Sequence, residues 1–105
     1  MFYDSKAGLT RMTLTVKLIG ALKHAAGSDT ITVNYRKGLS IKGLLKEVTT
    51  LAPELKRSLV GPQLEDQGLN ALILLNSKEI SALNGLDTKL KDKDEIVFVP
   101  VVHGG

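Results

Sequence analysis

The residues best suited to chemistry are Gly104 and Gly105, which follow a strand-like apolar run and carry a terminal carboxylate. Two glycines bury no side chain and lose more backbone entropy on ordering than other residues, so they add little to a folded core. They suit a tail that threads a narrow site and presents its carboxylate to another protein. We therefore expect the carboxylate of Gly105, rather than a side chain, to be the reacting group.

Side-chain chemistry has little support in this sequence. The absence of cysteine excludes disulfides, thiolate metal sites and a cysteine nucleophile. The two histidines, His24 and His103, lack the clustered carboxylates of a metal site, and no serine has the histidine and acid context of a nucleophile. The phosphate-binding spacing G-x-x-x-x-G-K is absent as well. We expect no catalytic side chain and no bound cofactor or metal on this chain, and we expect His103 to be a specificity contact or a solvated side chain.

Composition and charge limit the partners that we expect. The 105 residues are 43% hydrophobic and 24% charged, which is ordinary for one globular domain. The net charge of +3 is spread over scattered lysines without interleaved aromatic residues, so we expect no nucleic-acid partner. No apolar stretch approaches the roughly 20 residues of a membrane span, and residues 1–11 lack the apolar centre of a secretory signal. We expect a cytoplasmic protein with residues 1–11 as a flexible extension and Met12 as an alternative start.

Two segments in the first third of the chain alternate between apolar and polar residues, as half-buried strands do. They are residues 13–19 and 30–35, and we expect a loop between them that contains residues 21–26. A helix should follow, because Ser40 is a good N-cap and apolar residues recur at helical spacing at positions 41, 44, 45 and 48. We expect Leu51 to continue this apolar stripe and Pro53 to end the helix.

The sequence of the second half of the chain predicts a short helix and three more strands. The short helix falls within residues 54–60, and residues 61–68 form a loop by composition. The strands are expected at residues 71–75, 78–80 and 95–99, the second of them short. The order is therefore strand, strand, helix, strand, short strand, strand.

This order predicts an α+β fold of the β-grasp, or ubiquitin-like, type. One main helix would pack on a mixed sheet of four to five strands, with the first strand parallel to the last. The folded domain would span residues 12–100. Residues 101–105 would form a flexible C-terminal tail.

Two of the predicted strands carry more apolar residues than a two-layer fold needs. When the inward positions of residues 71–75 and 95–99 face the helix, four apolar residues face away from it: Leu72, Leu74, Val97 and Val99. We call these four residues the outer patch. An exposed contiguous apolar surface is typical of a partner site, so we expect a docking surface beside the tail. The alternative is that residues 61–69 or the N-terminal extension fold over it.

From residue 12 onward the sequence resembles the ubiquitin-like sulfur carriers, and the small subunit of molybdopterin synthase most of all. The archaeal ubiquitin-like small modifiers and the eukaryotic ubiquitin-related modifier share this architecture. The residues that carry the resemblance are Val16-Lys17-Leu18, Leu22-Lys23, Ala25-Ala26-Gly27, Asn76-Ser77-Lys78-Glu79-Ile80, Gly85-Leu86-Asp87-Thr88, Leu90, Asp92, Asp94-Glu95-Ile96, Pro100 and Gly104-Gly105. The chain departs from the family at Ile19, often phenylalanine, at Ser77, often glycine, and at His103, often a small residue.

The resemblance implies a mechanism for the terminus. A separate ubiquitin-activating-type enzyme would adenylate the Gly105 carboxylate with ATP, and sulfur would then replace AMP to give a thiocarboxylate. The outer patch, together with Val101, Val102 and His103, would contact the partner proteins. Residues 101–105 extend at most about 17 Å beyond Pro100, enough to enter a partner's active site.

Three functions remain open from the sequence. The chain could supply sulfur for molybdopterin synthesis as the non-catalytic small subunit of molybdopterin synthase, with the large subunit or another sulfur acceptor as partner. It could be a protein modifier joined through Gly105 to lysines of target proteins, with a role in tRNA thiolation. It could also be a binding module in which the Gly-Gly end is incidental.

Overall fold

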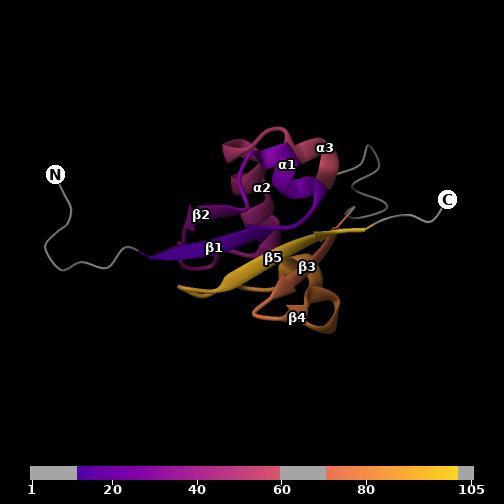
Figure 1. The fold of residues 1–105 in the computed structure, drawn as a ribbon. Helices are drawn as coiled ribbons and strands as arrows, with labels where there is room; N and C mark the ends of the chain where they lie inside the picture. The colour runs from indigo at the N-terminus through magenta and orange to yellow at the C-terminus, as the bar shows by residue number, and fades with distance from the viewer. Residues whose placement is uncertain (1–11, 60–70, 102–105) are drawn as a thin grey trace, which may run out of the picture.

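The fold is a five-stranded mixed sheet with helices on one side, as Figure 1 shows for a computed structural model that describes residues 12–59 and 71–101. The strands lie in the order β2-β1-β5-β3-β4. The elements are β1 (Thr13–Leu18), α1 (Ala21–Ala26), β2 (Thr30–Asn34), α2 (Ile41–Leu51), α3 (Leu55–Leu59), β3 (Ala71–Leu75), β4 (Lys78–Glu79) and β5 (Glu95–Pro100). Short 3-10 turns cover Ile80–Ala82 and Gly85–Asp87.

The centre of the sheet joins the two ends of the folded domain. β1 pairs in parallel with β5, with Val16 opposite Ile96, while β2 pairs antiparallel with the other edge of β1. β3 pairs antiparallel with β5 and with the two-residue strand β4. This topology confirms the β-grasp prediction, including the parallel first and last strands.

One face of the sheet and one face of α2 form the core. The inward side chains of β1 and β5 are almost fully buried, as in Val16, Ile96 and Phe98, each 0% exposed. The helix buries the four residues predicted from its spacing, namely Ile41, Leu44, Leu45 and Val48. Its N-terminus begins as predicted, because the Ser40 hydroxyl accepts a hydrogen bond from the Gly43 N–H at 3.3 Å. None of the helices in the described ranges is long and apolar enough to cross a membrane.

The prediction of a loop over residues 21–26 was wrong, because this segment forms the helix α1. Only Leu22 in it is fully buried, so six residues present too little apolar periodicity to reveal a helix. Local chemistry forms the helix instead. Alanine has the highest helix propensity, and Gly27 ends α1 in a left-handed conformation (φ 76°) with its N–H bonded to the Lys23 carbonyl.

The prediction that Leu51 continues the buried stripe of α2 was also wrong, since its side chain is 59% exposed. Leu51 is the last residue of the helix, and the chain turns at Ala52 toward α3. Leu55 and Leu59 of α3 are fully buried and fill the core beyond the end of α2. The predicted short helix within residues 54–60 is thus confirmed as α3.

A network of carboxylate and amide groups holds the beginning of β5. Asp94 accepts hydrogen bonds from the Lys91 N–H (2.7 Å) and the Asn76 side-chain amide (2.9 Å), and the Asn76 side-chain oxygen accepts one from the Glu95 N–H (3.0 Å). Asp92 accepts a bond from the Thr13 N–H (2.9 Å) at the start of β1. These acidic residues, part of the resemblance described above, therefore fix the strands rather than serve chemistry.

Replacing Asp94 by alanine removes two hydrogen bonds to a charged acceptor at a half-exposed site. We expect Asp94→Ala to lower the free energy of unfolding by about 1–2 kcal/mol, measured by urea denaturation. Asp87→Ala is the control, because Asp87 is exposed and its loss should change stability by less than about 0.5 kcal/mol. Equal losses in the two variants would contradict a structural role for Asp94.

Candidate functional site

The outer patch lies on the face of the sheet opposite the core. Along β3 the side chains alternate sharply, with Ile73 1% exposed and its neighbour Leu72 44% exposed, while Leu74, Val97 and Val99 are half-buried. The strand register places Leu72 directly opposite Val99 and Leu74 directly opposite Val97. Cross-strand partners at these positions are in side-chain contact range. The four residues therefore lie together, facing away from α2 as predicted, and their binding of a partner stays a prediction.

The neighbouring half of this face is polar and borders the patch. β1 contributes Lys17, whose position lies opposite Val97. The Lys17 ammonium contacts the Glu95 carboxylate at 2.8 Å. This hydrogen bond, with the attraction of the carboxylate charge, raises the pKa of Lys17. The exposed Lys17–Glu95 ion pair thus borders the outer patch on its β1 side.

The last strand connects the patch to the predicted tail. Val99 belongs to the outer patch, Pro100 lies opposite Ala71 at the start of β3, and Val101 is 37% exposed. The other predicted tail contacts and the reactive end, namely Val102, His103, Gly104 and Gly105, lie outside the described residues, so their roles stay predictions. The segments proposed as alternative covers of the patch, residues 1–11 and 61–69, also lie outside the described ranges.

Ile19 is a candidate contact residue that the sequence reasoning did not include in the site. It follows β1 directly, is 48% exposed, and donates its N–H to the Phe98 carbonyl at 3.3 Å. Because β1 and β5 are parallel, Ile19 and Val101 both follow the C-terminal ends of their strands, at the same end of the sheet. Parallel pairing of the first and last strands was predicted, so this proximity could have been inferred from it.

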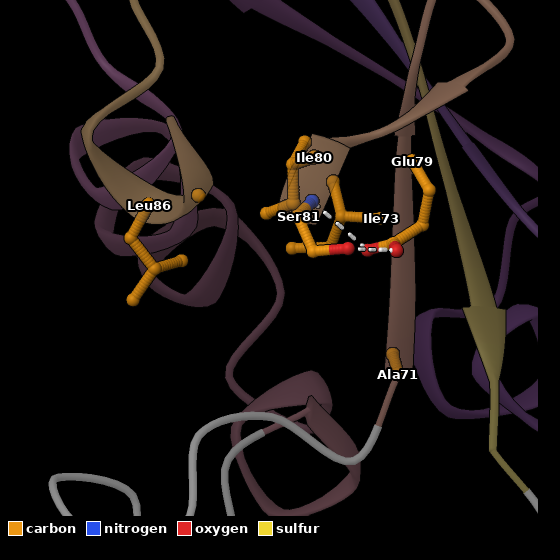
Figure 2. Close-up of a pocket in the computed structure, with 7 residues that line it drawn as sticks. Ala71, Ile73, Glu79, Ile80, Ser81 and Leu86 are labelled. Carbon is orange, nitrogen blue, oxygen red and sulfur yellow. Dashed lines mark hydrogen bonds between the residues drawn. The ribbon is translucent and has the colours of Figure 1, made fainter. Parts of the chain in front are cut away.

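A hollow of about 220 Å³ lies on the other face of β3 and contains none of the predicted site residues. Figure 2 shows the residues that line it, namely Ala71, Ile73, Glu79, Ile80, Ser81, Gly85 and Leu86. The Glu79 carboxylate accepts hydrogen bonds from the N–H (3.2 Å) and hydroxyl of Ser81, which lower the pKa of Glu79. These bonds cap the following 3-10 turn. We regard the hollow as a structural feature.

Substitution by asparagine should change the free energy of unfolding very differently on the two faces of β3. Leu72→Asn should change the free energy of unfolding by less than about 1 kcal/mol, because Leu72 faces outward. Ile73→Asn should cost more than about 3 kcal/mol, because it removes core packing and buries an amide. Urea denaturation measures both. If Leu72→Asn is as destabilising as Ile73→Asn, other parts of the chain cover the outer patch and it is not a docking surface.

Comparison with known proteins defines the class of protein to which this fold and surface belong. The model of the ThiS family matches residues 16–105. SAMP1 from Methanosarcina acetivorans is 31% identical, with a TM-score of 0.70 over 91% of this chain and 99% of its own. SAMP1 from Haloferax volcanii is 25% identical, with a TM-score of 0.74 over 89% and 99% of the two chains. A protein from Pyrococcus furiosus that is described as a candidate molybdopterin converting factor, subunit 1, shares the fold at 22% identity. Its TM-score is 0.69 over 87% of this chain and 99% of its own.

These are small proteins of the ubiquitin-like carrier class. The chain belongs to the ThiS family, whose members and structural neighbours are ubiquitin-like sulfur carriers and modifiers. No curated protein shows significant sequence similarity to it. The resemblance found in the sequence is thereby confirmed for the family.

Proposed function

We propose that this chain is a sulfur carrier whose Gly105 carboxylate is activated by a separate, ubiquitin-activating-type enzyme in the cytoplasm. The carboxylate would attack the α-phosphorus of ATP, releasing pyrophosphate and leaving an acyl adenylate. A sulfide ion (HS⁻) would then attack the Gly105 carbonyl and displace AMP, and loss of the sulfur-bound proton would leave a thiocarboxylate. The proposed recipient is molybdopterin synthesis, with the large subunit of molybdopterin synthase as the acceptor of the carrier.

The observation that carries this proposal is the continuity between the outer patch and β5. Val97 and Val99 belong to the patch, and the same strand leads through Pro100 to Val101. The family match extends from β1 through Gly105, which supports a reactive role for this end of the chain.

Docking and chemistry are then performed by different parts of the molecule. The outer patch is built on paired strands whose inward side chains are in the core, so it presents a rigid surface. A partner bound there holds the C-terminal residues near its active site at high effective concentration. The described side chains would bind and orient, and the partner would supply the catalytic groups.

A second candidate function is protein modification through Gly105. The same activated carbonyl would be attacked by a lysine amine of a target protein, giving an isopeptide bond. This candidate is favoured by the 31% identity to the small archaeal modifier protein 1 of Methanosarcina acetivorans. The carrier and modifier functions share the activation step, so one protein can perform both. A role in tRNA thiolation would use the thiocarboxylate of the first function.

Mass spectrometry of the protein purified from its native host tests the proposal. We expect a C-terminal peptide heavier by the exchange of one oxygen for one sulfur. Lysines of other proteins that carry a Gly-Gly remnant or a longer fragment of the tail would identify conjugation, and trypsin would leave the longer fragment because Lys93 is the last basic cleavage site. In reconstitution with the host's adenylating enzyme, Gly105→Ala should slow ATP–pyrophosphate exchange and deletion of Gly105 should abolish it. Normal activation of the truncated protein would contradict both functions.

A further inference from the structure

Strand pairing between β1 and β5 stops at a defined point just before the tail. The N–H of Ile19 donates to the Phe98 carbonyl at 3.3 Å. In a parallel ladder the next bond would run from the N–H of residue 100 to the carbonyl of Ile19. Residue 100 is proline, which has no N–H to donate. The ladder therefore cannot add this bond.

The Ile19 carbonyl has a different partner in the structure. It accepts a hydrogen bond from the N–H of Leu22 at 3.2 Å, which begins the turn into α1. Gly20 makes this turn possible, since its φ of 61° and ψ of −131° lie in a region open to glycine. β1 thus ends at the point where β5 has no N–H donor, at Pro100, and the two strands separate there.

Pro100 also fits closely between its neighbours. A Cβ atom on Gly20 would lie 3.4 Å from the Cγ atom of Pro100, so the proline ring lies beside the glycine backbone. On the other side of β5, Pro100 is paired with Ala71, which is 8% exposed. The ring fixes the backbone φ of Pro100 near −65°. The direction of the chain at this residue is therefore set by covalent geometry and by contacts on both sides.

We infer that Pro100, packed against Gly20, is a positioning residue for the activation of the terminus. It ends the β1–β5 ladder at the Ile19–Phe98 hydrogen bond, so that no further ladder bond to β1 holds the end of β5, from which Val101 leads to the reactive end. This inference rests on the proposed function, since it concerns how the reactive end is delivered. Pro100 is not one of the residues of the outer patch.

The test replaces Pro100 by alanine or by valine in the full-length protein. Both variants restore an N–H that can bond to the Ile19 carbonyl, and valine retains a strong strand preference. With the host's adenylating enzyme, we expect kcat for carrier-dependent ATP–pyrophosphate exchange to fall roughly three- to tenfold, the scale of one net hydrogen bond. The KM for the carrier should stay unchanged, because the docking surface is intact. The new N–H at residue 100 should be protected from hydrogen exchange.

Pro53→Ala is the matched control, because Pro53 is an exposed proline between α2 and α3 and belongs to no strand of the sheet. It should leave kcat and KM at the wild-type values. A wild-type kcat in both Pro100 variants, or a raised KM with unchanged kcat, would overturn the positioning role. Failure of the wild-type protein to support any exchange would instead overturn the proposed function, and the inference with it.

Discussion

The parallel pairing of β1 with β5 is the constraint on which the rest of the structure depends. It joins the first and last strands at the centre of the sheet, with Val16 opposite Ile96 and Leu18 opposite Phe98. All four of these side chains face the core and are at most 3% exposed. α2 packs on this centre, β2 and β3 add to its two sides, and the end of β5 is placed beside the end of β1. Such long-range pairing has to offset the entropy lost when the intervening chain is closed into a loop.

The described helices cover one side of the sheet and leave the other side uncovered by helices. The polar half, on β2 and β1, includes Lys17, which forms an exposed ion pair with Glu95 of β5. The apolar half, on β5 and β3, is not required by the core, because Ile73 and Phe98 already fill the inward positions. The residues that carry the family resemblance lie at both ends of β5. Asp92 and Asp94 hold the beginning of the strand, and Pro100 is its last residue, where pairing with β1 stops.

Most of the fold could be predicted because strand alternation and helical spacing report directly which side chains are buried. The outward positions of Leu72, Leu74, Val97 and Val99 followed from alternation alone. The helix α1 could not be predicted in this way, because one buried residue, Leu22, is too few to show the spacing of a helix. The exposure of Leu51 depends on where α3 packs, and the position of Ile19 next to β5 depends on pairing between residues far apart in sequence. Tertiary contacts decided these two features, whereas local helix propensity and the Gly27 C-cap formed α1.

The central claim is that docking by the outer patch and reaction at Gly105 are separate properties of one small domain. Competition measures this separation most directly. A protein lacking Gly104 and Gly105 should inhibit activation of the full-length chain competitively, with an inhibition constant close to the carrier's KM. The same truncated protein with Leu72→Asp should inhibit at least roughly tenfold more weakly, because a charge in the patch opposes its burial. If the truncated protein does not compete, or if the Leu72 substitution leaves its inhibition unchanged, the outer patch is not the docking surface.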